Sequence, residues 1–303
     1  MASLTVNIAG VRLKNPIILA SGTCGYGREL ARIYDLSRLG GIAVKGTTLL
    51  PRAGNAPPRI AETASGMLNS VGLQNPGIKA VIETELPFLA SYNTAVIVNI
   101  AGHSLDDYRQ IAELLEACGN FAAIELNISC PNVAGGGMAF GTDAAVAANI
   151  TKAVREACRK PLIVKLSPNV TSIAEIAKAV EAAGADALSL INTLQGLAID
   201  LEQRKPVLGA VTGGLCGPAI KPIALRMVWQ AKKAVKIPII GLGGIASAAD
   251  ALEFMLAGAS AVQIGSAAFR DPLLPLKVAE GMAEWLDAQG VADVNELVGA
   301  LKT

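Results

Sequence analysis

Eight short apolar runs, spaced along the whole chain and separated by alanine-rich stretches, most constrain how this sequence can fold. The runs are rich in Val and Ile, which favour strands buried on both faces. The stretches between them, such as 172–185 and 247–259, have the periodicity of amphipathic helices. This alternation predicts an α/β fold, a (β/α)8 TIM barrel, with a doubly wound open sheet as the competing architecture. The runs are 16–21, 41–46, 95–102, 122–129, 162–168, 187–192, 237–244 and 261–267.

The length of 303 residues suits one such barrel with additions, because eight βα units need about 250 residues. We therefore expect residues 1–303 to form a single domain. The opening segment LTVNIAGVRLKNP predicts a β-hairpin that turns at Ala9-Gly10 and closes the barrel floor. Three long connections, 47–94, 130–145 and 193–220, are expected to rise above the strand ends and build an active site there.

The charge balance argues against nucleic acid or an anionic membrane as a partner. The chain has 26 Lys and Arg against 25 Asp and Glu, so it carries no net basic field. No apolar run approaches the roughly 18 residues that a membrane span needs, and the first residues lack a secretion-signal pattern. We expect a soluble, cytoplasmic protein that acts on small molecules.

The five cysteines are too far apart for a zinc or iron–sulfur motif. No two lie closer than twelve positions, whereas such sites use CxxC-type spacing, and we expect no metal on this chain. The single histidine, His103, leaves a thiol–imidazole pair only one possible base. We expect four of the thiols to be buried and inert: Cys24, Cys118, Cys158 and Cys216.

Polar residues and glycines stand where the predicted barrel strands end. One such asparagine alone would be an ordinary turn former, but here the pattern recurs along successive runs. Because parallel strands bring their carboxyl ends to one face, we expect these residues to share a site. In chain order they are Ser21, Lys45, Asn99, Asn127, Lys165, Asn192, Gly243-Gly244 and Gly265-Ser266.

The last two strand ends predict a phosphate site. GLGGIAS (241–247) and IGSAAF (264–269) would offer backbone N–H groups and a serine hydroxyl beside the positive end of a helix. The first motif alone would fit a simple tight turn, but the pair indicates a phosphorylated ligand. Lys45 and Lys165 would form a Schiff base, face an anionic ligand as cations, or pair with acids at the rim. Beside asparagines, they suit an anion with carbonyl and N–H edges.

The chain resembles the class 1 dihydroorotate dehydrogenases over essentially its whole length, because several of its longer motifs look like that family's motifs and occur in the same order. Within that family the chain looks most like type 1B, whose catalytic chain works with a separate electron-transfer subunit. The motifs are NSVGLQNPG (69–77), ELNISCPNV (125–133) with GGMAFG (136–141), VKLSPNVT (164–171), INTLQG (191–196), TGGLCGPAIKP (212–222), and GLGG with IGS.

The resemblance implies oxidation of (S)-dihydroorotate to orotate in de novo pyrimidine synthesis, with FMN as the phosphorylated ligand. It assigns the FMN phosphate to Gly243, Gly244, Gly265 and Ser266. It assigns the isoalloxazine to Ser21, Lys45, Gly46, Asn99, Asn127, Lys165, Ile191 and Gly217. It assigns the substrate to Lys45, Asn69, Ser70, Val71, Gly72, Leu73, Asn127, Asn132, Asn192 and Thr193.

The same resemblance makes Cys130 the general base that takes the C5 proton while the C6 hydride goes to flavin N5. A thiol with an ordinary pKa of about 8.5 needs only modest electrostatic help for this task. Lys165 would stabilise the negative charge of reduced flavin near N1, and Lys45 would contact both flavin and substrate. The glycine-rich segment after Cys130 is expected to be a lid, with a permanently ordered turn as the alternative.

Electrons would leave through another chain, because this one shows no cluster ligands and no second nucleotide motif. The resemblance implies a partner subunit with FAD and a [2Fe-2S] cluster that passes electrons to NAD, in a heterotetramer built on a homodimer of this chain. Four alternatives stay open: a type 1A enzyme that reduces fumarate, a related dihydropyrimidine substrate, a Schiff-base lyase using Lys165 or Lys45, and a non-catalytic flavin- or phosphate-binding module.

Overall fold

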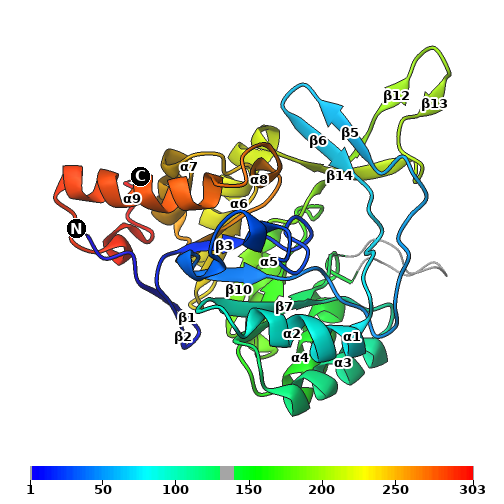
Figure 1. Cartoon of the computed structure of the whole chain (residues 1–303), viewed down its shortest axis with the longest axis horizontal. Helices are drawn as coiled ribbons and strands as arrows, with labels where there is room; N and C mark the ends of the chain where they lie inside the picture. The colour runs from blue at the N-terminus through cyan, green and yellow to red at the C-terminus, as the bar shows by residue number, and fades with distance from the viewer. Residues whose placement is uncertain (1, 130–139, 303) are drawn as a thin grey trace.

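The computed structural model describes residues 2–129 and 140–302, and a closed parallel barrel of eight strands forms its centre (Figure 1). Each predicted run contains one strand, so the (β/α)8 barrel is confirmed and the open sheet is excluded. The ladder closes where β16 pairs with β3. The barrel strands are β3 (Ile17–Leu19), β4 (Gly41–Ala43), β7 (Ala95–Ile100), β8 (Ala123–Asn127), β9 (Leu162–Lys165), β10 (Ala187–Leu190), β15 (Ile239–Leu242) and β16 (Ala261–Ile264).

Helices surround the barrel, and four of the long ones start at predictable capping residues. Ser104, Asp143, Ser172 and Ser247 each accept a hydrogen bond from a backbone N–H of the first turn, which satisfies a donor that the helix itself leaves free. The predicted helices in 172–185 and 247–259 are present. The long helices are α3 (Leu105–Cys118), α4 (Ala144–Ala157), α5 (Ile173–Ala182), α6 (Lys221–Ala234), α7 (Ala248–Ala257) and α9 (Leu274–Gln289).

Shorter helical segments lie in the connections between these elements. Those before β7 are η1 (Leu30–Arg32), η2 (Leu36–Arg38), α1 (Ile78–Ala80), the π-helical η3 (Val81–Glu85) and α2 (Leu86–Leu89). Those of the carboxyl-terminal half are η4 (Pro218–Ile220), α8 (Ala267–Arg270) and η5 (Val294–Leu297). Across 2–129 and 140–302, no helix is both long enough and apolar enough to cross a lipid bilayer.

The amino-terminal hairpin closes the floor of the barrel, as predicted. Strands β1 (Val6–Ile8) and β2 (Val11–Leu13) pair antiparallel, and the turn between them places Ala9 at φ 52° and Gly10 at φ 87°. Hairpin side chains meet the apolar lower ends of the barrel strands around one small space, lined by Ile8, Val11, Leu13, Ile18, Ile97, Ala123, Ile163 and Ile240. A ligand must therefore approach from the opposite end.

Two of the long connections join in a second sheet at that opposite end. The first connection contributes β5 (Ile60–Thr63) and β6 (Gly66–Asn69), and the second contributes β11 (Leu194–Leu197) and β14 (Thr212–Cys216). They pair antiparallel in the order β11-β14-β6-β5. A further hairpin, β12 (Ile199–Asp200) with β13 (Lys205–Pro206), projects beyond this sheet (Figure 1). The pairing of β6 with β14 places Asn69 opposite Gly214.

Candidate functional site

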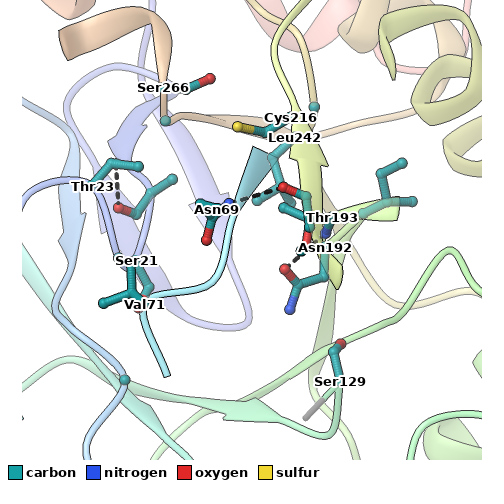
Figure 2. Close-up of a pocket in the computed structure, with 18 of the residues that line it drawn as sticks. Ser21, Thr23, Asn69, Val71, Ser129, Asn192, Thr193, Cys216, Leu242 and Ser266 are labelled. Carbon is teal, nitrogen blue, oxygen red and sulfur yellow. Dashed lines mark hydrogen bonds between the residues drawn. The ribbon is translucent and has the colours of Figure 1, made fainter. Parts of the chain in front are cut away.

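A cavity of about 680 Å³ lies between the carboxyl ends of the barrel strands and the four-stranded sheet (Figure 2). Its volume falls within the usual range for a cofactor or substrate site, about 300–1,000 Å³. Every predicted site residue that the structure describes lines it. They are Ser21, Lys45, Gly46, Asn69, Ser70, Val71, Gly72, Leu73, Asn99, Asn127, Lys165, Ile191, Asn192, Thr193, Gly217, Gly243, Gly244, Gly265 and Ser266.

Two predicted site residues, Cys130 and Asn132, lie outside the described residues, as does the predicted lid through residue 139. The described chain nevertheless leads to the cavity on the amino-terminal side of this segment. Asn127, the last residue of β8, and Ser129 both line it. Cys130 follows Ser129 directly in the sequence.

The charged side chains that line the cavity are cationic. They are those of Lys45, Arg52 and Lys165, and the described lining residues include no aspartate or glutamate. Because the low-dielectric walls of a cavity strengthen the field of such charges, this lining favours an anionic ligand. Arg52 and His103 were not among the predicted site residues, and the guanidinium of Arg52 contacts Nε2 of His103.

The glycine loop after β15 is held against the start of α6. Gly243 and Gly244 have φ of 125° and 80°, and a Cβ on Gly244 would stand 2.9 Å from the carbonyl oxygen of Gly217 and 3.0 Å from the backbone nitrogen of Lys221. Only glycine allows both this conformation and this close approach. The loop leads into the amino terminus of α7, where backbone N–H groups favour an anion.

Asp250 fixes this loop from within α7. Its carboxylate accepts hydrogen bonds from Ala246 N at 2.9 Å, Ser247 Oγ at 2.9 Å and Lys221 Nζ at 2.5 Å. Burial acts to raise the pKa of Asp250, but these hydrogen bonds outweigh it and hold the pKa below its usual range. The side chain thus ties the glycine loop to α6, the helix before it, and to α7, the helix after it.

A polar cluster occupies the barrel interior beneath the cavity. Glu125, fully buried in the middle of β8, accepts hydrogen bonds from Asn99 Nδ2 at 2.6 Å, Ser189 Oγ at 2.9 Å and Gln263 Nε2 at 2.6 Å. The ammonium of Lys165 lies 3.8 Å from its Oε2. Asn99, Lys165 and Gln263 also line the cavity, so the cluster connects the cavity wall to a buried acid.

Two acceptors in this wall find no hydrogen-bond donor among the described residues: Oδ1 of Asn99 and Oε1 of Gln263. Both residues are buried and line the cavity. An unpaired buried acceptor costs about 1–3 kcal/mol, and an N–H group of a bound ligand would remove that cost. The wall therefore fits a ring system with amide edges, such as the pyrimidine portion of a flavin.

The asparagines on the other side of the cavity are held by local hydrogen bonds. Ser129 N donates to Oδ1 of Asn127 at 3.1 Å, and Thr193 N donates to Oδ1 of Asn192 at 2.8 Å. Nδ2 of Asn69 donates to the carbonyl of Gly214 at 3.1 Å. Figure 2 shows Asn69, Asn192 and Thr193 near one another although they come from two connections. Ordered amides of this kind suit recognition of a small ring with carbonyl and N–H edges.

The prediction that four thiols are buried was wrong for two of them. Cys24 and Cys158 are buried, and burial raises their pKa to about 12 and about 11. Cys118 and Cys216 are partly exposed, because one ends an outer helix and the other ends β14 beside the cavity. Burial still raises the pKa of Cys216.

Sequence reasoning missed the interior cluster because it considered only the strand ends. Glu125, Ser189 and Gln263 each interrupt an apolar run, in AIELN, ALSL and AVQI. A polar residue within a strand that is buried on both faces needs a partner. That signal was present in the sequence, although it does not say which partners meet.

Comparisons with known proteins agree with the motifs. The family model described as dihydroorotate dehydrogenase matches residues 3–286. The chain is 58% identical over 300 residues to the catalytic subunit of dihydroorotate dehydrogenase B (NAD(+)) of Geotalea uraniireducens strain Rf4, covering 99% of this chain and 98% of that protein. It is 56% identical over 302 residues to the protein of that name from Bacteroides thetaiotaomicron, covering 100% of both. The protein of that name from Parabacteroides distasonis is 59% identical over 301 residues, covering 99% of both.

Proposed function

This chain belongs to the dihydroorotate dehydrogenase family, and we propose that it is a catalytic subunit that oxidises (S)-dihydroorotate to orotate in de novo pyrimidine synthesis. The observation that carries the proposal is the cavity itself. Its described walls carry three cations and no carboxylate, with a glycine loop on one wall and ordered asparagines on others. A phosphorylated cofactor and an anionic ring substrate both match this lining.

FMN is the proposed cofactor, and all residues assigned to it line the cavity. Gly243, Gly244, Gly265 and Ser266 would hold its phosphate, and the unpaired acceptors of Asn99 and Gln263 suit the N–H edge of its ring. Bound FMN would supply the acceptor for the hydride that leaves substrate C6. The other proposed ring contacts are Ser21, Lys45, Gly46, Asn127, Lys165, Ile191 and Gly217.

Lys165 would provide electrostatic stabilisation. Lys165 is only 5% exposed and lines the cavity, where a fixed cation stabilises the negative charge that a reduced flavin ring carries. Lys45 lies two residues after the end of β4 and would contact both the ring and the substrate carboxylate. We assign no Schiff base to either lysine, since a hydride transfer needs none.

Substrate selectivity would come from paired amide edges. The segment Asn69 to Leu73, with Asn127, Asn132, Asn192 and Thr193, would meet the carbonyl and N–H groups of dihydroorotate. When a site forms a hydrogen bond to each polar edge of its substrate, an analogue that lacks one edge leaves a polar group of the site without a partner and is rejected. The cation of Lys45 and the Asn69 segment would distinguish the carboxylated ring from uncharged dihydropyrimidines.

Cys130 would be the base that accepts the proton from C5 while the hydride leaves C6. Support comes from its position one residue after Ser129, which lines the cavity. Cys130→Ala should keep FMN bound but slow its reduction by dihydroorotate at least ~100-fold at pH 7, since a positioned base contributes about 10²–10⁴. Stopped-flow absorbance under anaerobic conditions measures this rate.

Cys118→Ala is the matched control for this variant. Cys118 ends α3 and does not line the cavity, so its loss should leave the rate of flavin reduction unchanged. Rapid bleaching of Cys130→Ala at the wild-type rate would remove Cys130 from the mechanism.

Electrons are proposed to leave through a partner subunit with FAD and a [2Fe-2S] cluster, which reduces NAD. We place the chain in the cytoplasm, as a single domain of 303 residues and as a homodimer within a heterotetramer. The relatives' names support a separate partner subunit and NAD as the acceptor, because they combine the term catalytic subunit with NAD(+). The type 1A alternative, which reduces fumarate, needs no such partner.

An anaerobic visible spectrum of the purified chain tests the whole proposal. Yellow protein that bleaches with dihydroorotate and stays bleached with NAD is expected. Reoxidation by fumarate would instead favour type 1A. Colourless protein that takes up no FMN would refute the proposal and favour a Schiff-base lyase, which borohydride trapping would reveal.

A further inference from the structure

We propose that Glu125 is a positioning residue that sets the reduction potential of the flavin through Lys165 and Asn99. The inference rests on the proposed FMN site. It concerns a buried acid that does not line the cavity but contacts three residues that do: Asn99, Lys165 and Gln263.

Glu125 stands at the centre of contacts from four other strands. Its Oε2 accepts from Asn99 Nδ2 of β7 at 2.6 Å and lies 3.8 Å from Lys165 Nζ of β9. Its Oε1 accepts from Ser189 Oγ of β10 at 2.9 Å and from Gln263 Nε2 of β16 at 2.6 Å. Glu125, Asn99 and Ser189 have no measurable exposure, and Gln263 is 1% exposed. The carboxylate therefore orients the side-chain amide of Asn99 and holds the ammonium of Lys165 at the cavity wall.

Stability alone does not account for an acid at this place. Burying a carboxylate carries a large desolvation cost, and replacing a buried ion pair by well-packed apolar side chains of similar volume is often neutral or stabilising. Ile124 and Leu126, the neighbours of Glu125 on β8, are buried apolar residues, but they face the opposite side of the strand and do not pack against the carboxylate. The contacts of Glu125 instead run towards the cavity wall, where charge matters for a redox cofactor.

The sign of the effect follows from the ion pair. With Glu125 charged, the positive charge of Lys165 is partly compensated, so the cavity wall stabilises a reduced, negatively charged ring less than Lys165 alone would. Removing the carboxylate charge leaves that cation uncompensated. The reduced form of the flavin then becomes more favourable, and its potential rises.

Glu125→Gln removes the charge and keeps the shape. The new amide N–H₂ can find an acceptor, because the side-chain amide of Asn99 or of Gln263 can turn over to receive it, which leaves the unpaired oxygen of the other residue for the ligand. Ser189→Ala is the matched control, since it deletes one hydrogen bond to Glu125 while the charge stays. Ser189 does not line the cavity.

The measurement is anaerobic equilibration of bound flavin with a reference dye, without substrate, alongside a fluorescence titration of FMN binding. Glu125→Gln should bind FMN and raise the ratio of reduced to oxidised flavin at fixed potential at least ~10-fold, about 30 mV for a two-electron couple. Ser189→Ala should stay within about threefold of wild type.

Three outcomes would overturn the inference. One is a Glu125→Gln protein that binds FMN with an unchanged ratio, and another is an equal shift in Ser189→Ala. If Glu125→Gln does not fold, Glu125→Met carries the same test, and failure of both to fold would assign Glu125 to stability alone. A wild-type chain that binds no FMN would instead refute the proposed function, which separates the two failures.

Discussion

Replacing Gly244 by alanine should damage the glycine loop far more than the same change at Gly10. Both glycines have positive φ, 80° and 87°, so the backbone strain of the two substitutions is matched. Their surroundings differ. A Cβ at Gly10 meets nothing within 4 Å, whereas at Gly244 it would stand 2.9 Å from Gly217 O and from Lys221 Cβ and 3.0 Å from Lys221 N.

The magnitudes separate the two variants. A left-handed conformation costs an alanine about 1–2 kcal/mol at either position. Crowding adds about 1–3 kcal/mol at Gly244, because two of the crowded atoms are backbone and cannot rotate away. If the loop shifts to relieve this contact, the added cost appears as weaker FMN binding, by about 5- to 150-fold in Kd.

Fluorescence titration of the apoprotein with FMN, with urea unfolding in parallel, measures both quantities. Gly244→Ala should lose FMN affinity by that factor, while Gly10→Ala should lose only about 1–2 kcal/mol of stability and keep the wild-type Kd. Equal FMN affinities in the two variants would refute the proposal that the closely packed loop at Gly244 holds the FMN phosphate.

Two further predictions concern Asp250 and the thiols. Asp250→Asn should lose about 1–3 kcal/mol of unfolding free energy at pH 7 and weaken FMN binding. Because the native pKa of Asp250 is lowered, its stabilisation is present above pH ~4 and is lost as the pH falls through the native pKa. The unfolding free energies of wild type and variant, measured with urea, should therefore converge towards pH 3. A difference in unfolding free energy that stays constant with pH would contradict this. When native protein is treated with iodoacetamide at pH 8, Cys24, with its pKa of about 12, should remain unmodified, and FMN should protect the cavity thiol Cys216. Mass spectrometry of peptides measures the alkylation of both thiols. Equal alkylation of Cys216 with and without FMN would place the cofactor elsewhere.

The barrel and the set of strand-end residues could be predicted because their signals are local. Each apolar run by itself predicts one strand, and parallel strands necessarily bring their carboxyl ends to one face of the barrel. Lys45, Asn127 and Lys165 therefore had to share a site once eight strands were recognised. The identity of the ligands did not follow from these patterns, and came from the resemblance of longer motifs to a family.

Exposure of individual thiols was harder to predict. Cys216 follows an apolar leucine in a short run and resembles a buried thiol in the sequence. The structure places it in a sheet that faces the cavity, and there Cys216 lies opposite Met67 of β6, a strand from a connection far away in the chain. Burial there depends on sheet pairing that no local pattern contains.

The sequence by itself determined the eight strands, their order, the floor hairpin and the polar residues at the strand ends, since each depends on neighbours along the chain. Only the tertiary structure decided which of these residues meet. Closure of the barrel brings Asn99, Ser189 and Gln263 to Glu125 from 26, 64 and 138 positions away, and pairing of β6 with β14 joins Asn69 to Gly214 across 145. These contacts depend on the register between strands that are distant in the sequence, and the spacing of residues along one strand carries no information about that register.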